Sequence, residues 1–383
     1  MNKKTIILLN LVAIKKGGGQ QVAVSFLNVI LENKIIDLSF FIIATKGTIL
    51  AKKLITQNTY KYILIENHVF KRAIFDLYLI RKIVKTYKID LIYSLFGPPI
   101  FAQDTISVSG VAVSNIFYPE IKFWHGNIFY LLRKLIIDKY RLATFKKANA
   151  LIFENNDMRI RGKELHGMSE SIFIHPSISI QKKTPSAVVI DQIKHLDKKK
   201  YTVIMLTGVH PNKKIEAVIP ILKHLKDLNE QGIDFAISIS PSHSFAIKLM
   251  EQAKNYNLEN NIKFLGAVNP EDVSTLSKNI DAYLLISLLE SFSNNIIEAW
   301  SYERPLLITD ADWSRSICND AALYVDRENE NDIALKILNL SKSKFQQKKL
   351  IEAGCVELQK YPSPEDKVWL QLDYLKKVLK NKK

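Results

Sequence analysis

The sequence predicts an α/β protein that contains two doubly wound domains, each built on a parallel sheet. Short continuous apolar runs alternate with helix-like segments along the chain, and such runs are typical of strands that are buried on both faces of a parallel sheet. The length of 383 residues suggests two or three domains, and 47% hydrophobic residues are enough to form sizeable cores. Residues 181–200 contain several lysines and little apolar periodicity, so we expect a linker there between domains of residues 1–180 and 201–360.

The first domain is expected to begin with a strand, a glycine turn and a helix. The apolar run Thr5 to Ile14 precedes the turn Gly17 to Gly19, and apolar residues with helical spacing follow from Gln20 to Leu31. Asn10 interrupts the apolar run and no small-residue cleavage site follows it, so we do not interpret it as a signal peptide. The glycines form either a plain tight turn or a place where backbone amides approach a phosphate or a sugar. Further strands are expected at Leu38–Ala44, Ile89–Leu95 and Ala150–Glu154.

The second domain is expected to begin in the same way. A strand, a loop and a helix are expected at Tyr201–Thr207, Gly208–Lys214 and Ile215–Leu228, and further strands at Phe235–Ser240 and Asn261–Gly266. Lysines at the start of a helix oppose its dipole, so Lys213 and Lys214 are unfavourable unless an anion lies beside them. This predicts a phosphate site that uses one of the two lysines. His210 in the same loop either donates a hydrogen bond to that anion or makes a structural hydrogen bond.

Two glutamates with seven residues between them follow a later strand. The apolar run Ile280–Leu289 predicts a buried strand, which places Glu290 at its carboxyl end, where ligands bind in open α/β sheets. Glu298 lies in the next predicted helix, which Asn294 or Asn295 can cap. Either Glu298 completes a capping box with Asn295 while Glu290 is merely solvated, or both carboxylates bind a polar ligand.

The neighbouring strand end carries carboxylates as well. The short predicted strand Leu306–Thr309 is followed by a polar loop that contains Asp310 and Asp312. Because two consecutive strand ends bear carboxylates, a ligand site is favoured over helix capping.

From Ile280 to Asn329 the chain resembles the sugar-donor-binding half of retaining glycosyltransferases of family 4, which share the GT-B fold. Their hallmark is a glutamate, seven residues and a second glutamate, usually ESFG-x4-EAMA, followed by a strand that contains proline. The same frame here reads ESFSNNIIEAWSYERPLLITDADWSRSICNDAALYVDREN. This variant resembles a subgroup associated with bacterial surface polysaccharide assembly. The match is specific over roughly fifty residues and loose elsewhere. It implies two Rossmann-like domains that face each other across a cleft, with residues 1–180 binding the acceptor and residues 201–360 binding the nucleotide sugar.

The resemblance implies roles for individual side chains. Glu298 is expected to hold the ribose hydroxyls of a nucleotide, and Glu290 is expected to contact hydroxyls of the transferred sugar. Lys213 or Lys214 is expected to stabilise the charge of the departing diphosphate. The further sugar-donor contacts that the resemblance implies are at Gly18, Gly19, Gly208, His210, Phe292, Ser293, Asn294 and Asn295.

The chain departs from the family pattern at two places. An arginine that family members often carry in the first loop of the second domain is replaced by Val209 or His210. Many members also place a histidine after a first-domain strand, where this chain has Phe117 and Tyr118. His125 is close in sequence, and whether it reaches the site is open.

The resemblance therefore implies a retaining glycosyltransferase that moves a sugar from a nucleoside diphosphate to a glycan acceptor, expected to be lipid-linked, in lipopolysaccharide, O-antigen or capsule assembly. It implies no protein nucleophile, metal or cofactor, because the nucleotide sugar is a co-substrate and a phosphate oxygen takes the acceptor proton. The alternatives are a nucleotide-sugar epimerase of GT-B architecture, a glycogen-phosphorylase-like enzyme and a basic nucleic-acid-binding protein. The chain shows no recognisable signature of the first two, and no zinc spacing, RNA-binding aromatic motif or isolated basic arm.

Positive charge is concentrated in the first domain. The chain has a formal net charge of +16, and residues 1–180 contribute +13 of it, with 25 Lys/Arg against 12 Asp/Glu. The segments Phe70–Lys88 and Tyr130–Lys147 mix apolar residues with cations, and Phe117–Leu132 between them is rich in aromatic residues. These segments either contact an anionic membrane surface or combine core aromatics with solvated cations. No apolar run approaches the roughly 20 residues that span a bilayer.

The cysteines and the C-terminal segment complete the prediction. Cys318 and Cys355 have no disulfide-framework or metal-site spacing, which favours a reducing cytoplasm. With the basic first domain, this predicts a cytoplasmic protein that is peripheral on the inner face of the plasma membrane. Residues 361–383 contain two early prolines and are expected to form a basic helix that crosses back to the first domain.

Overall fold

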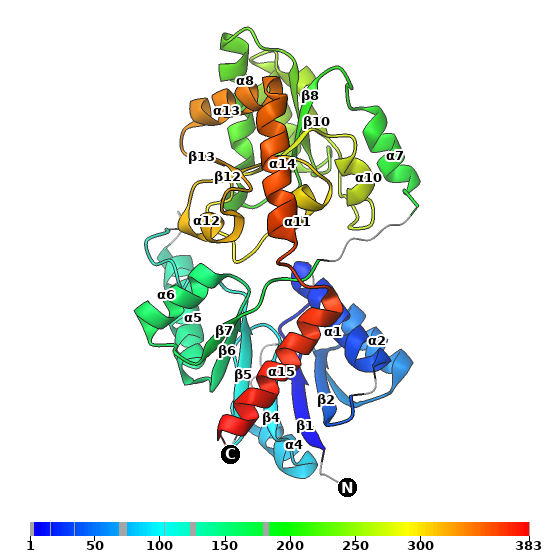
Figure 1. Ribbon diagram of the computed structural model, residues 1–383, viewed down its shortest axis with the longest axis vertical. Helices are drawn as coiled ribbons and strands as arrows, with labels where there is room; N and C mark the ends of the chain where they lie inside the picture. The colour runs from blue at the N-terminus through cyan, green and yellow to red at the C-terminus, as the bar shows by residue number, and fades with distance from the viewer. Residues whose placement is uncertain are drawn as a thin grey trace. The chain divides into compact units, whose positions relative to one another are not determined.

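The computed structural model describes residues 4–15, 17–33, 35–68, 75–102, 104–122, 128–178 and 184–382. The chain forms two compact units (Figure 1). The first unit combines Met1–Ile178 with Pro362–Lys383, and the second unit is Ser179–Tyr361.

The first unit is built on a seven-stranded sheet with the order β3-β2-β1-β4-β5-β6-β7, in which all neighbouring strands are parallel. The order reverses between β1 and β4, as in Rossmann-type sheets. The strands are β1 (Thr5–Asn10), β2 (Leu38–Thr45), β3 (Lys61–Ile65), β4 (Leu91–Ser94), β5 (Ile106–Val111), β6 (Ala150–Phe153) and β7 (Ser171–Phe173). The helices are α1 (Gly18–Glu32), α2 (Ile49–Gln57), α4 (Ile80–Tyr87), α5 (Ile128–Lys147), α6 (Asn156–His166) and α15 (Pro364–Lys382), and the π-helical turn η1 (Phe75–Leu79) precedes α4.

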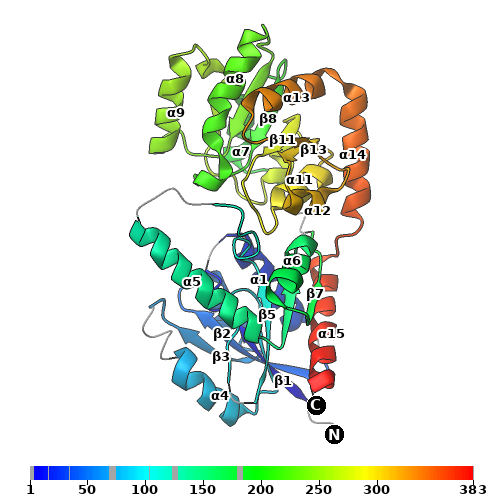
Figure 2. The ribbon, with the colours of Figure 1, turned by 90° about the vertical axis from the view of Figure 1, so that its left-hand side faces the viewer.

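Both faces of this sheet are buried, which explains the continuous apolar runs of its strands. Ile7 and Leu9 of β1 belong to a core cluster that also contains Phe26 of α1 and Leu372 of α15. Leu8, which points to the opposite face, belongs to a second cluster that includes residues of η1 and α4. Figure 2 shows α5 at the periphery of this unit.

The second unit is built on a six-stranded parallel sheet with the order β10-β9-β8-β11-β12-β13, which reverses between β8 and β11. The strands are β8 (Tyr201–Met205), β9 (Ile233–Ile237), β10 (Ile262–Phe264), β11 (Ala282–Leu285), β12 (Leu306–Thr309) and β13 (Leu323–Val325). The α-helices are α7 (Ala187–Lys194), α8 (Val218–Asp227), α9 (Ser244–Lys254), α10 (Val273–Ser277), α11 (Asn294–Ser301), α12 (Asp312–Cys318), α13 (Glu330–Lys342) and α14 (Lys344–Leu358). The 3-10 turns are η2 (Pro211–Lys213), η3 (Ile215–Ala217) and η4 (Glu259–Asn261).

The predicted fold class is confirmed, because the chain contains two Rossmann-like, doubly wound parallel-sheet domains of the GT-B type. The sequence did not predict β3, β5, β7 or β13. In β5 the reason is visible: Ser107 and Ser109 break the apolar pattern although both are buried. Their hydroxyls donate hydrogen bonds to the carbonyl oxygens of Ile100 (2.7 Å) and Gly97 (2.6 Å), which satisfies them inside the sheet.

The stretch 181–200, expected to be a linker, differs from that expectation. From residue 184 it is described, and it contains α7, which belongs to the second unit. Ser186 caps this helix, and the Asp272 carboxylate accepts hydrogen bonds from the Ser186 amide (3.0 Å) and hydroxyl (2.8 Å). Gln192 donates a hydrogen bond to the Leu265 carbonyl. These partners lie more than 70 residues away, so local periodicity does not reveal them.

The C-terminal helix α15 packs on the first unit. Its apolar residues join the core cluster that contains α1, and Figure 1 shows the two helices side by side. Lys367 of α15 is 2% exposed and forms an ion pair with Glu154, which directly follows β6. This buried pair ties α15 to the carboxyl end of the sheet.

We expect Lys367→Met to lower the free energy of unfolding of the first unit by roughly 3 kcal/mol, because it leaves the Glu154 carboxylate unpaired in a nearly buried position. The free energy of unfolding should fall less in the double variant Glu154→Gln/Lys367→Met than in the single variant, because the double variant removes both charges. Chemical denaturation of the full chain, followed for each transition, measures this. A double variant as unstable as the single one would contradict the explanation.

Candidate active site

The candidate site lies at the carboxyl edge of the second sheet, where the strand order reverses. The loops that follow β8 and β11 meet there, because β8 and β11 are hydrogen-bonded neighbours. In open α/β sheets this switch point is the usual ligand position, since loop amides and helix N-termini converge on it.

Asn212 holds the two loops together. Its side-chain amide donates to the Leu289 carbonyl (2.9 Å), and its side-chain oxygen accepts from the Leu289 amide (3.1 Å). Its backbone carbonyl also accepts from the Leu288 amide (2.9 Å). His210 contributes locally, because its Nδ1 accepts a hydrogen bond from the Asn212 amide (3.1 Å) and so caps η2. The positions of Lys213 and Glu290 follow from this junction.

The two adjacent lysines have different surroundings. Lys213 forms an ion pair with Glu290, and both side chains are partly exposed, at 23% and 16%. Lys214 adopts a left-handed backbone conformation and points instead to the segment between β13 and α13. There it donates to the Arg327 carbonyl and pairs with Glu328 (3.0 Å) and Glu330 (3.1 Å). Of the two lysines, only Lys213 therefore contacts the loop that carries Glu290.

The start of α11 differs from the expected cap. Ser293 occupies the N-cap position, and it makes no side-chain capping hydrogen bond. Asn294 is exposed, and the Asn295 side chain donates to the Leu206 carbonyl after β8 (2.8 Å). The expectation that an asparagine caps this helix is therefore wrong, and so is the capping box with Glu298, which is the fifth helical residue rather than the third. Asn295 instead forms a second link between the two loops.

Glu298 is a largely buried carboxylate, and burial raises its pKa to about 7. Its carboxylate makes no hydrogen bond or ion pair with any residue that the structure describes. Its charge raises the pKa of the neighbouring Tyr283 and Tyr302 hydroxyls, although burial is the larger cause for both. An unpaired buried carboxylate destabilises a fold, and such groups gather at functional sites.

The predicted glycines have different surroundings. Gly18 and Gly19 open α1 at the switch point of the first sheet, and it is the preceding Gly17 whose φ of +76° requires glycine. Gly208 has an ordinary backbone conformation, and a Cβ atom added there would meet nothing within 4 Å. Its conformation therefore does not require glycine, and the open space beside it is available to a ligand.

Three aromatic positions are structural. The Phe292 ring lies 5.9 Å from the Tyr361 ring within the second unit. In the first unit, Phe117 packs edge-on against Phe153 in the core, and the Tyr118 hydroxyl donates to Asp157 (2.7 Å). Neither residue replaces a sugar-binding histidine in any visible way. His125 lies outside the described residues.

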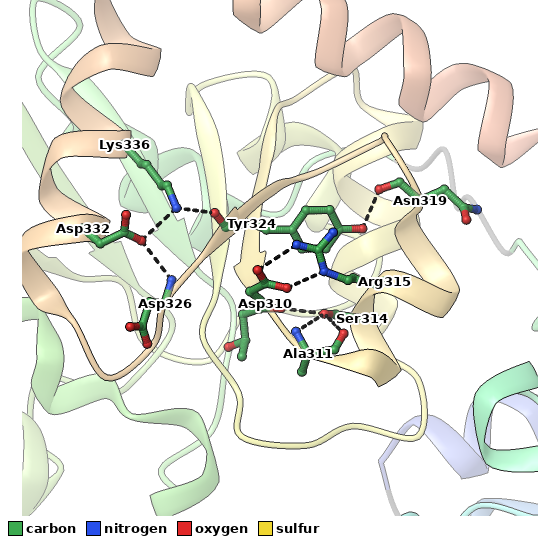
Figure 3. Close-up of polar contacts among 10 residues, drawn as sticks. Asp310, Ala311, Ser314, Arg315, Asn319, Tyr324, Asp326, Asp332 and Lys336 are labelled. Atoms are coloured by element: carbon green, nitrogen blue, oxygen red, sulfur yellow. Dashed lines mark hydrogen bonds and ion pairs between the residues drawn. The ribbon is translucent and has the colours of Figure 1, made fainter. Parts of the chain in front are cut away.

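The carboxylate after β12 is engaged internally, which the sequence did not predict. Asp310 accepts two hydrogen bonds from the guanidinium of Arg315, at 2.5 Å and 2.7 Å (Figure 3). This hydrogen bonding lowers the pKa of Asp310. Arg315 in turn stacks on the Tyr324 ring, 4.4 Å from its centre. The second strand end thus carries a structural pair, and the candidate site reduces to Lys213, Glu290 and Glu298.

Comparison with known proteins places this site within a recognised domain. Residues 188–355 match the model of the family described as "Glycosyl transferases group 1". The chain is 24% identical to "Protein CapJ" of Staphylococcus aureus over 271 residues, which is 68% of this chain and 63% of that protein.

Solved structures agree on the fold. A glycosyltransferase from Rickettsia africae superposes with a TM-score of 0.73 at 18% identity, covering 99% of this chain and 100% of that one. Anabaena Alr3699/HepE, solved with UDP and glucose, superposes with a TM-score of 0.69 at 16% identity, covering 97% and 100%. Residues 188–355 of the second unit therefore match a glycosyl transferases group 1 model, and the solved structures show a GT-B fold.

Proposed function

We propose that this chain is a retaining glycosyltransferase that moves a sugar from a nucleoside diphosphate to a lipid-linked glycan acceptor during assembly of a bacterial surface polysaccharide, such as lipopolysaccharide, O-antigen or capsule. The observation that carries the proposal is the Lys213–Glu290 ion pair at the switch point of the sheet in a group 1 domain, followed by the largely buried carboxylate of Glu298 in α11. Binding of UDP and glucose by the structural neighbour HepE supports a nucleotide-sugar co-substrate.

In this proposal the two glutamates hold different parts of the sugar donor. Glu298 accepts hydrogen bonds from both hydroxyls of the ribose, which supply the partners that this carboxylate otherwise lacks. The amides at the start of α11, from Phe292 to Asn295, face the phosphates, where the helix dipole favours negative charge. Glu290 contacts hydroxyls of the transferred sugar.

Lys213 carries the main electrostatic role. The bond between the anomeric carbon and the phosphate oxygen breaks, and its electron pair leaves with the diphosphate, next to the Lys213 ammonium group. A new bond forms from the acceptor oxygen to the same face of the anomeric carbon, and a phosphate oxygen takes the acceptor proton. This route assigns no step to a protein nucleophile, a metal or a cofactor. The Lys213–Glu290 pair fits it, because a bound diphosphate can attract Lys213 while Glu290 turns to the sugar.

We also propose that the protein docks on an anionic membrane through one face of α5. This face exposes half or more of six large apolar side chains, together with four cations. They are Ile128, Phe129, Leu132, Leu135, Ile136 and Tyr140, with Arg133, Lys139, Lys146 and Lys147. The helix has one acidic residue, Asp138, which binds Lys134 (2.6 Å) and Asn115 (2.7 Å) away from this face.

Charge favours a membrane over a second copy of the chain as the partner of this face. Two such faces would bring equal positive charges together, whereas anionic lipids attract them and accept the apolar side chains. No helix in the described part of the chain is long and apolar enough to cross a bilayer. Docking through α5 would bring the chain to a lipid-linked acceptor at the membrane surface.

The function is tested by a panel of nucleotide sugars, with binding and turnover measured on the purified chain. We expect Lys213→Met to lower turnover by about 100-fold or more, because it removes the cation beside the leaving diphosphate. Lys214→Met, its matched control, should change turnover less than about fivefold and mainly lower stability, because Lys214 pairs with Glu328 and Glu330. The function proposal fails if no nucleotide sugar binds, and the lysine assignment fails if Lys214→Met is the more damaging change.

Glu298→Gln should stabilise the protein in a pH-dependent way. The pKa of Glu298 lies near 7 instead of its usual 4.5, so the folded state binds more protons than the unfolded state between these values. The wild type therefore loses stability as pH rises from about 4.5 through about 7, by up to about 3 kcal/mol. We expect the variant to be more stable than wild type at pH 8 and nearly equal at pH 4.5, by denaturant titration.

The same variant should bind nucleotide sugar at least about tenfold more weakly at pH 8, because it loses a charged acceptor for the ribose hydroxyls. Wild-type affinity should rise between pH 6 and pH 8 while that of the variant stays flat. Equal nucleotide affinity in both proteins, measured by calorimetry, would contradict the role of Glu298.

Membrane docking is measured by flotation with vesicles. Phe129→Ser/Ile136→Ser should abolish most of the flotation with anionic vesicles at low salt, whereas Phe345→Ser/Val356→Ser, two exposed apolar positions of α14, should not. Binding should weaken when salt is raised from about 0.05 M to about 0.5 M, because the cations are exposed. Flotation that does not change with lipid charge, with salt or with the Phe129→Ser/Ile136→Ser substitutions would refute this docking.

A further inference from the structure

The first unit contains a cavity of about 810 Å³ at the carboxyl edge of its sheet. The loops after β1, β3 and β4 form part of its wall, together with the end of β2. Residues of α4 and α5 complete it. The cavity therefore lies on the same kind of sheet edge as the candidate active site, but within the other unit.

Buried polar residues position the loop after β1, which lines this cavity. The proposed function does not use these residues. Asn10 at the end of β1 donates to the Ser94 hydroxyl (2.9 Å) and accepts from the Val12 amide (3.1 Å). Thr45 donates to the Val12 carbonyl (2.8 Å). Asn10, Ser94 and Thr45 are each no more than 2% exposed. These contacts fix the loop after β1, and with it the position at which Lys15 enters the cavity wall.

Three cations from three separate elements line the cavity. Lys15 comes from the loop after β1, Arg81 from α4 and Arg141 from α5. The cations outnumber the one carboxylate of the lining, Glu66. A cleft lined by an excess of one charge focuses its field on a ligand of the opposite sign.

The partners of these cations leave much of their charge uncompensated. Lys15 donates to the side-chain oxygen of Asn67, which is neutral. The Arg81 guanidinium makes no hydrogen bond or ion pair with any residue in the described part of the chain. Arg141 meets Asp138 only at 3.5 Å, and this carboxylate is already bonded by Lys134 at 2.6 Å. Converging cations of this kind suit a phosphate group.

Part of the remaining wall is apolar and continues onto the outer face of α5. Phe101 and Ile137 are each 37% exposed although they line the cavity, and the Tyr140 ring lies beside them. Tyr140 also belongs to the apolar, basic face of α5 described above. One ligand can therefore place a phosphate against the cations and a hydrocarbon chain against the apolar wall.

We infer that this cavity binds the phosphate-bearing head of an amphiphilic acceptor, with the phosphates against Lys15, Arg81 and Arg141 and the first hydrocarbon units against Phe101, Ile137 and Tyr140. The inference rests on the proposed function, since it names the chemical class of the acceptor of that reaction. A soluble sugar phosphate would use the cations and leave the apolar wall exposed to water.

The test is a calorimetric titration of the full chain with farnesyl diphosphate, in the presence of saturating UDP to occupy any nucleotide site. Farnesol and inorganic pyrophosphate are titrated separately. We expect farnesyl diphosphate to bind at least about tenfold more tightly than either, because only it engages both the cations and the apolar wall. Pyrophosphate binding as tight as that of farnesyl diphosphate would show that the cavity does not select an amphiphile. Competition between farnesyl diphosphate and UDP would show that the two ligands do not bind at separate sites.

Variants localise the binding. Arg81→Gln/Arg141→Gln should weaken farnesyl diphosphate binding at least about tenfold. The matched control Lys82→Gln/Lys85→Gln removes two exposed cations of α4 that do not line the cavity, and should change affinity by less than about twofold. Equal losses in both double variants would show non-specific attraction and overturn the inference.

The outcome is separable from that of the proposed function. UDP and nucleotide sugars are titrated into the same samples, and Lys213, Glu290 and Glu298, which are proposed to bind them, lie in the second unit. Nucleotide binding without farnesyl diphosphate binding overturns this inference alone. Farnesyl diphosphate binding without any nucleotide binding overturns the glycosyltransferase proposal, and with it the assignment of the cavity to an acceptor.

Discussion

The candidate site depends on the junction that Asn212 makes between the loops after β8 and β11. Lys213 and Glu290 are 77 residues apart in the chain, and no local structure could bring them together. The sheet brings the two residues close together, because β8 and β11 are neighbours at the point where the strand order reverses. Asn212 then fixes the register of the loops with hydrogen bonds to Leu288 and Leu289, and Asn295 adds a second link to Leu206.

The charged side chains that hold the fold together have partners, whereas the carboxylate of Glu298 has none in the part of the chain that the structure describes. Lys367 and Glu154 are buried together, and Asp310 is held by both nitrogens of Arg315, so these charges have partners. Glu298 has none among the described residues. The hydroxyl of the buried Ser287, just beyond β11, also lacks a hydrogen-bond partner in the described structure. An unpaired carboxylate is unfavourable, and in the proposed function the ribose hydroxyls of a bound nucleotide supply the partners that Glu298 lacks.

The fold was predictable because its signals are local, whereas much of the site was not. Apolar runs predicted most core strands, and the two glutamates were found from their spacing and from the strand that precedes Glu290. Three features of the site could not be predicted, because they depend on residues that are distant in the sequence. Lys213 and Lys214 look equivalent in the chain, and only the partners of Lys214 after β13 distinguish them. Asn295 was expected to cap α11, but its side chain instead donates a hydrogen bond to the Leu206 carbonyl after β8. Asp310 looked like a ligand-binding carboxylate until Arg315 was placed beside it.

The two units also balance their charge differently. In the second unit the candidate lysines face carboxylates: Lys213 faces Glu290, and Lys214 faces Glu328 and Glu330. The first unit holds most of the net positive charge. Three of its cations line the cavity, and four more lie on the outer face of α5, where acidic residues are scarce. Self-repulsion of this kind destabilises a compact domain. An anionic partner relieves it, and the apolar side chains beside the same cations restrict that partner to one that also offers hydrocarbon. Charge and hydrophobicity together therefore favour the lipid-bearing anion proposed for the first unit, in contrast to the polar ligand proposed for the second unit.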